Sequence, residues 1–319
     1  MKAWTLLLGL AAGCAGSPPP AAPLPSTPES APAPAATEPT QAVDEPYETP
    51  DLGLSGQAEP ETKLTLEPTD ADVKTALADA DAGHLDRAGQ RLSKEIARID
   101  REATLDDRMV AHALLGRSFA ATRQWKLAAN EYGRVSALWQ DPKAAEAELP
   151  EDSRPRHLAQ ALMAVGEAVY FAAEQKRRTA DALKPPRFTG GDFGRWTRDK
   201  LAPWLAKKRV ALDATEQAYT RVLDIRPAAP PHWVIGSAAR VGELYDSLVK
   251  DLEGLPVPPS VARDPKLEAT YEATMSEMVE PYRKRARAAY ELCQKYGERF
   301  SIESADTELC AQRLAALAP

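Results

Sequence analysis

The stretch that decides the fold runs from Val110 to Leu138 and reads VAHALLGRSFAATRQWKLAANEYGRVSAL. Apolar residues recur every three or four positions on both sides of a polar turn at 122–124, which predicts two short amphipathic helices. Gly116 in the first helix and Ala128 in the second are small enough to let the helices approach closely. The larger side chains expected to fill the seam between them are Leu115, Phe119 and Tyr132.

This spacing resembles the tetratricopeptide repeat (TPR). Leu115-Gly116-x-x-Phe119 is followed nine positions later by Ala128, and then by Tyr132. One such helix pair cannot bury its apolar face alone, so the resemblance implies stacked neighbouring pairs. We therefore expect an all-α, TPR-like solenoid of antiparallel helix pairs over residues 69–319.

Weaker copies of the motif occur on both sides of this pair. The same spacing of an apolar residue, a glycine and a second apolar residue occurs in Val165-Gly166-x-x-Val169 and in Val241-Gly242-x-x-Tyr245. A polar connector is expected from Asp141 to Pro155. The other expected helices are 70–81 and 85–99 as a degenerate first pair, 157–183 and 205–225 as the third, 232–252 and 265–297 as the fourth, and 303–317 as a C-terminal cap.

Two insertions are expected to interrupt the third and fourth pairs, at 184–203 and 253–264. The first is rich in aromatic residues and glycines, but it follows no strand, so it is no phosphate-binding loop. Two interpretations of its aromatic side chains are open: they pack back on the solenoid, or they face a partner protein. These side chains are Phe188, Phe193 and Trp196.

The N-terminus has the pattern of an export signal. Residues 1–13 have a positive charge at Lys2 and then an apolar run, which is typical of a signal peptide. The segment that ends in Cys14 resembles the lipobox of bacterial lipoproteins, which implies a lipidated Cys14. Because Ala15 rather than Asp follows the cysteine, the resemblance favours an outer-membrane lipoprotein facing the periplasm. The alternative is an ordinary secretory signal, a free cysteine and a secreted or periplasmic protein.

Residues 14–68 are predicted to be a disordered tether. Eleven of the 28 prolines lie between Pro18 and Pro50, among Ala, Ser, Thr and Glu. Proline prevents helix and sheet from propagating, and this segment has too little apolar surface to offset the entropy of ordering. We interpret it as a semi-rigid spacer between a membrane and the helical domain, with a proline-rich ligand for another module as the alternative.

Composition excludes several classes of function. The net charge of −7 argues against nucleic-acid binding, and no apolar run is long enough to span a membrane. The four histidines lie in different predicted elements and no HExxH or paired CxxC occurs, so we expect no metal site. There is no G-x-S-x-G or Walker-type motif either, and we expect neither catalytic residues nor a cofactor.

Cys293 and Cys310 are expected to form a disulfide if the protein is exported. They lie seven residues before and ten residues after a turn near Phe300, on consecutive antiparallel helices. At a rise of about 1.5 Å per residue the two positions differ by only a few ångströms along the helix axes. The alternative is two separate buried small residues.

The TPR resemblance also implies a groove lined by the first helices of the pairs. The positions that match it here either bind a protein or peptide segment or are ordinary surface. They are Arg117, Ala120, Ala121, Met163, Glu167, Tyr170, Glu243 and Asp246.

Together these features predict a non-enzymatic scaffold that is anchored to a bacterial membrane and holds a protein of an envelope complex, in assembly, secretion or motility. A structural spacer of the periplasm is the alternative, and a cell-wall-acting enzyme is a further one. The sequence assigns no partner identity and no oligomeric state.

Overall fold

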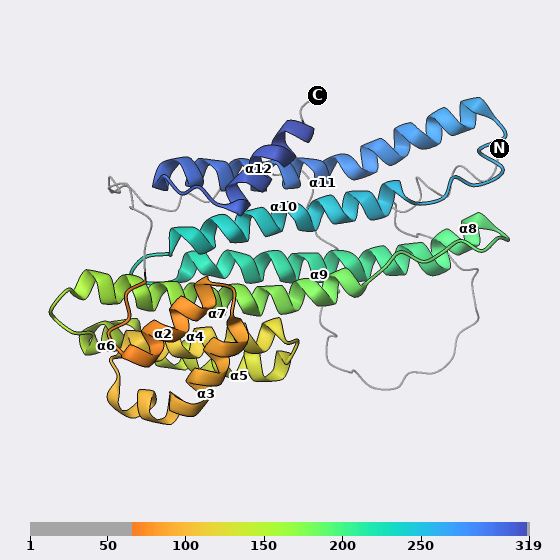
Figure 1. Cartoon of the computed structure of the whole chain (residues 1–319). Helices are drawn as coiled ribbons and strands as arrows, with labels where there is room; N and C mark the ends of the chain where they lie inside the picture. Colours follow the sequence, from red (N-terminus) through yellow and green to blue (C-terminus); the bar gives the residue numbers. More distant parts are fainter. Residues whose placement is uncertain (1–65, 318–319) are drawn as a thin grey trace, which may run out of the picture.

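A computed structural model describes residues 66–317, and within that range the protein is all-α, with no strand (Figure 1). The signal peptide, Cys14 and nearly all of the predicted tether lie outside the described residues. The helices are α2 (Ala71–Asp81), α3 (Leu85–Glu102), α4 (Leu105–Ala121), α5 (Trp125–Leu138), α6 (Pro142–Glu148), α7 (Arg154–Ala182), α8 (Phe193–Trp196), α9 (Ala202–Thr220), α10 (Pro231–Glu253), α11 (Pro265–Phe300) and α12 (Ala305–Ala316).

The prediction of packed antiparallel helix pairs is confirmed. The pairs are α2 with α3, α4 with α5, α7 with α9, and α10 with α11. The first helix of each pair also contacts the first helix of the next pair, and each second helix contacts the following first helix. Helix α12 packs on both α10 and α11, so it occupies the place that the first helix of a further pair would take.

Glycines set the close approach of the paired helices. A Cβ atom added to Gly116 would lie 2.8 Å from the ring of Tyr132, and one added to Gly242 would lie 2.3 Å from the ring of Tyr290. Both tyrosines are on the second helix of the same pair and are at most 5 % exposed. The glycine–aromatic spacing in the sequence therefore corresponds to a physical seam in which the ring occupies the volume of a missing side chain.

The expected insertions are the ends of two long helical hairpins. Helix α7 has 29 residues and α11 has 36, and they run well beyond the short pairs α2/α3 and α4/α5 (Figure 1). A separate hydrophobic core joins the two hairpin ends, and its members include Trp204, Leu248 and Leu255. The interruption predicted at residues 184–203 is thus partly helical, with α8 and a π-helical turn leading into α9.

Two smaller expectations differ from the structure. The predicted polar connector contains α6, which begins after the N-cap Asp141 and buries Ala145 and Leu149 against the neighbouring pairs. Helix α11 runs through Pro281, as the expected range 265–297 implies, but it ends at Phe300 instead of residue 297.

The helical body begins before residue 69. Leu66 packs against the core of the first pair, and Pro68 is buried. The backbone N–H of Glu67 donates a hydrogen bond to Gln160 Oε1 on α7, at 2.5 Å. Residues 66–68, which were predicted from the sequence to be tether, therefore belong to the packed part of the chain.

The structure joins Cys293 on α11 to Cys310 on α12 in a disulfide, with a Cα–Cα distance of 6.4 Å. Both residues are fully buried in the main core. The bond therefore fixes α12 against the longest helix of the chain.

Replacing both cysteines by serine is expected to lower the free energy of unfolding by about 3 kcal/mol, because the bond closes a loop of 17 residues and restricts the unfolded chain. Urea unfolding of the double variant measures this loss. Free thiols at both positions in mass spectrometry of the unreduced protein would contradict the bond itself.

Within the described residues, no helix has the length and apolar character that crossing a bilayer requires.

Candidate protein-binding face on the first helices

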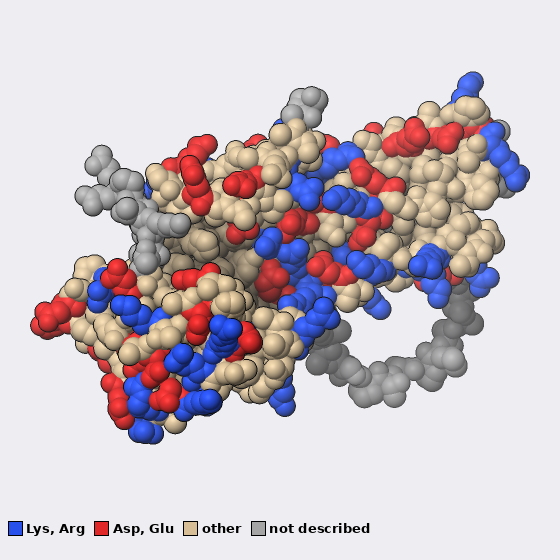
Figure 2. Space-filling model, in the orientation of Figure 1, with Lys and Arg blue, Asp and Glu red and all other residues tan. Residues whose placement is uncertain are grey.

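The candidate site is the surface formed by α2, α4, α7, α10 and α12, which we call the first-helix face. Figure 2 shows this side of the molecule hollowed between the α2/α4 region and α12, with acidic and basic side chains gathered there. All eight groove positions predicted from the sequence lie on α4, α7 or α10. The polar ones are engaged with one another or with side chains from neighbouring helices.

Arg117 and Glu167 form the first of these contacts. Arg117 on α4 donates to Glu167 on α7 through two nitrogens, at 2.9 and 2.7 Å. Glu167 also accepts a hydrogen bond of 2.8 Å from the hydroxyl of Tyr132 on α5. The Glu167 side chain is only 10 % exposed, whereas that of Arg117 is 37 % exposed. This cluster therefore ties three helices together and leaves the edge of the guanidinium open to solvent.

Arg240 on α10 is the centre of the next cluster. It donates to the hydroxyl of Tyr170 and to Glu243, each at 2.8 Å. The same guanidinium lies 3.7 Å from Glu174 on α7 and 3.7 Å from Asp306 on α12. Arg240 thus links three successive first helices, and the predicted groove residues Tyr170 and Glu243 meet only through it.

Arg177 on α7 completes this cluster. It lies 3.2 Å from Glu243 and 3.5 Å from Glu174. Asp246, one turn further along α10, accepts a 2.8 Å hydrogen bond from the hydroxyl of Tyr290 and lies 3.9 Å from Arg313 on α12. Carboxylates and guanidinium groups therefore alternate along the face from α4 to α12.

The tyrosine hydroxyls of this network act as hydrogen-bond donors. Tyr219 on α9 donates a 2.5 Å hydrogen bond to Glu174. Burial raises the pKa of Tyr132, Tyr219 and Tyr290 well above the ordinary value, and the carboxylate that each one contacts raises it further. A tyrosine that stays protonated can only donate to a carboxylate. The Glu167 carboxylate in turn raises the pKa of the Arg117 guanidinium, which stays charged.

The remaining predicted positions are not polar contacts. Ala120 packs partly buried against the main core, and Ala121 is exposed at the end of α4. Met163 is half-buried on α7, and its backbone carbonyl accepts a 2.8 Å hydrogen bond from the Trp233 indole.

Sequence reasoning missed half of the network. The spacing that selected Glu167 and Tyr170 continues along the same face of α7 to Glu174 and Arg177, but the prediction stopped at the usual length of a TPR helix. The other missed residues are Arg240, Asp306 and Arg313. Asp306 and Arg313 had no signal at all, because only the docking of α12 beside α10 brings them onto the face.

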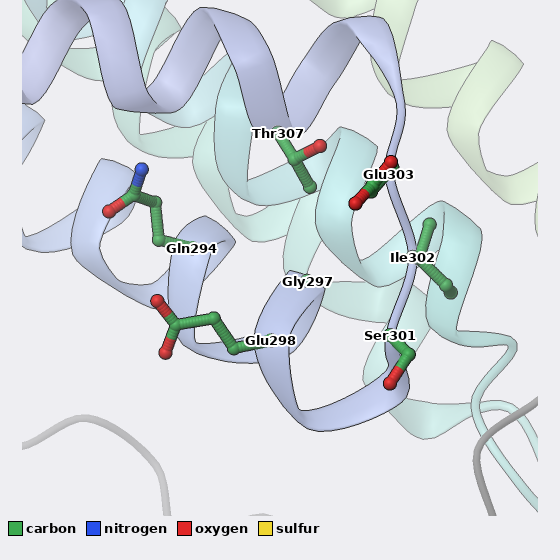
Figure 3. A pocket seen from close by; sticks show the side chains of 7 residues that line it. All are labelled: Gln294, Gly297, Glu298, Ser301, Ile302, Glu303 and Thr307. Atoms are coloured by element: carbon green, nitrogen blue, oxygen red, sulfur yellow. The ribbon is translucent and has the colours of Figure 1, made fainter.

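Two pockets occur elsewhere on the described part of the chain. The larger has a volume of about 340 Å³ and lies at the turn between α11 and α12 (Figure 3), where Glu298 and Glu303 are among the side chains that border it. The smaller, about 50 Å³, lies between α9, α10 and α11. No group of His, Cys, Asp and Glu suited to hold a metal ion occurs within residues 66–317.

Comparison with protein-family models, with curated proteins and with solved structures found no match.

Proposed function

We propose that the protein is a TPR-like, non-enzymatic scaffold that binds a protein segment on its first-helix face. The observation that carries the proposal is the packing register: each first helix contacts its own second helix and the next first helix, from α2 to α12. This register generates a continuous surface of first helices, as the TPR resemblance at residues 110–138 implies. The Gly116–Tyr132 and Gly242–Tyr290 seams support the same assignment.

The chemistry of the face favours a protein segment with charges of both signs as the ligand. Carboxylates and guanidinium groups alternate along it, and each is held in place by a neighbouring helix. A surface ordered before binding loses little entropy when the partner arrives. A cell-wall-acting enzyme would instead need an acid and a base that converge on a substrate cleft, whereas these carboxylates are engaged with guanidinium groups and tyrosine hydroxyls.

We also propose that lipidated Cys14 anchors the chain to a bacterial outer membrane and that the proline-rich segment spaces the scaffold from it. The lipobox-like sequence before Cys14 supports this arrangement. The disulfide between Cys293 and Cys310 fits an oxidising compartment such as the periplasm.

If the protein were only a structural spacer of the periplasm, we would expect the chain's own insertions to fill the first-helix face. Residues of both insertions, including Trp196 and Leu255, pack in the separate core at the hairpin ends. The first-helix face is built instead by α2, α4, α7, α10 and α12, and the proposal of a binding scaffold is therefore preferred to that of a spacer.

The test is co-purification from detergent-extracted membranes with matched charge reversals. We expect the original chain to co-purify with a stoichiometric companion protein. Arg313→Glu should lower the amount of companion recovered by about tenfold, because reversing this charge repels a partner of complementary charge. The Arg313 side chain is 38 % exposed on the face. Arg134→Glu on α5, where the side chain is 61 % exposed, is the control and should keep the companion. Recovery of the protein alone, or equal retention by both variants, would count against the proposal.

A further inference from the structure

The end of the α7–α9 hairpin carries a charge opposite to that of the whole protein. Residues 176–209, which we call the basic tip, contain eleven Lys and Arg and three Asp, a net charge of +8 in a chain whose net charge is −7. The basic tip comprises the last turns of α7, the connecting loop, α8 and the first turns of α9. Figure 2 shows blue side chains at this end of the molecule, around the position of α8 in Figure 1, with uncharged surface beside them.

Some charges of the basic tip are paired within the described part of the chain, and others are not. Arg195 and Arg198 share Asp199, and the buried Lys208 lies 3.4 Å from Asp251. Seven others are exposed and form no ion pair within residues 66–317, so their charge is available to an external anion. Four of these seven are Lys184, Arg187, Lys200 and Lys207.

Apolar side chains lie among these charges. Phe188, Phe193 and Trp196 form a three-ring cluster with centroid distances of 5.2 to 5.4 Å, and each ring is only half-buried. Val210 is 70 % exposed on α9, and Val257 in the loop after α10 is 37 % exposed. These two are among the few large apolar side chains that the described residues expose, so the structure concentrates apolar exposure at the end that also concentrates positive charge.

This combination fits the interfacial region of a lipid bilayer. Lys and Arg attract anionic headgroups, while Trp, Phe and aliphatic side chains enter the boundary between headgroups and acyl chains. A strand of nucleic acid fits less well, because the three rings pack against one another and do not present open faces for stacking on bases. The basic tip is also the projecting end of a hairpin and not a groove along which a strand could lie (Figure 1).

We propose that the basic tip is a membrane-contact surface that binds the anionic headgroups of a lipid bilayer. Apart from Arg177, which belongs to both, it is distinct from the first-helix face, and it does not depend on lipidation of Cys14. The scaffold would then touch a membrane at a second point besides the proposed lipid anchor, which would fix its orientation.

The experiment uses the full chain with Cys14→Ser, so that no acyl anchor can form, and measures flotation with vesicles of phosphatidylcholine with or without phosphatidylglycerol. We expect binding only to the anionic vesicles, with loss at high salt, because exposed charges are screened. Lys184→Glu, Arg187→Glu, Lys200→Glu and Lys207→Glu together are expected to weaken binding by about tenfold or more.

The matched control makes the same change in net charge on exposed lysines of the α2–α6 region, namely Lys74→Glu, Lys94→Glu, Lys126→Glu and Lys143→Glu. The control should float as the parent chain does, and far-UV circular dichroism should show equal helicity in both variants.

Three results would overturn the proposal. One is equal loss in both variants, which would mean a response to overall charge. Another is equal flotation with neutral and anionic vesicles, which would assign binding to the N-terminal segment. The third is binding of labelled single-stranded nucleic acid, lost in the tip variant, without any binding to anionic vesicles. None of these results would bear on the first-helix face, whose test is the recovery of a companion protein.

Discussion

Replacing Gly116 by leucine is expected to destabilise the fold by about 3 kcal/mol or more, because the new side chain must enter a filled seam. Even a single Cβ at this position would lie 2.8 Å from the ring of Tyr132. That ring cannot easily move away, since its hydroxyl is bonded to Glu167 and its centroid lies 4.4 Å from that of the Phe171 ring. Thermal and urea unfolding followed by circular dichroism measure the loss.

Gly133→Leu is the matched control for this variant. Gly133 lies on α5 of the same helix pair and is exposed, and a Cβ added there would meet nothing within 4 Å. Leucine at this position should stabilise the protein by about 0.5–1 kcal/mol, because glycine is the poorer helix former. An unchanged melting temperature in Gly116→Leu would show that the contact between α4 and α5 is misplaced.

Replacing Asp106 by alanine is expected to cost about 3 kcal/mol or more, because it leaves two buried hydrogen-bond donors without a partner. Asp106 is fully buried at the start of α4. Its Oδ2 accepts hydrogen bonds of 2.7 Å from His157 Nδ1 and from Gln160 Nε2, both on α7. His157 and Gln160 are at most 3 % exposed, so water cannot replace the lost acceptor.

Asp86→Ala is the control, because Asp86 holds the same place in the first turn of α3 but is exposed. Its loss should cost less than about 1 kcal/mol, which is the ordinary contribution of an acidic residue to a helix N-terminus. Asp106→Asn should fall between the two, since its carbonyl oxygen can still accept both hydrogen bonds but carries no negative charge to strengthen them. Equal unfolding free energies for Asp106→Ala and Asp86→Ala would contradict the buried link between α4 and α7.

The local part of the fold could be predicted from the sequence. Helix positions follow from the spacing of apolar residues, and the turn at 122–124 separates α4 from α5 as expected. Proline and glycine marked most of the other ends. The prediction of a polar connector at residues 141–155 was wrong, because Asp141 as N-cap and Pro142 at the first position begin the short helix α6 there.

The candidate site could be predicted only in part. Helical periodicity selected Arg117, Glu167, Tyr170, Glu243 and Asp246, because positions three and four apart share a helix face. It could not show that Arg117 and Glu167 bind each other, or that Arg240 joins Tyr170 to Glu243. Those contacts depend on the offset between neighbouring helices, which no single helix encodes.

The sequence by itself determined that this protein is all-α. It also determined that glycine–aromatic seams such as Gly116 with Tyr132 hold helix pairs together. Both properties arise from residue spacing within about one helical turn or across one short loop. Only the tertiary structure decided which charges are buried and where the hairpins end. Asp86 and Asp106 look alike in sequence, yet Asp106 is buried because α7 docks over the start of α4. Asp86 at the start of α3 stays exposed among the described residues. Burial depends on which helices meet, and that is decided by the summed packing of the whole chain.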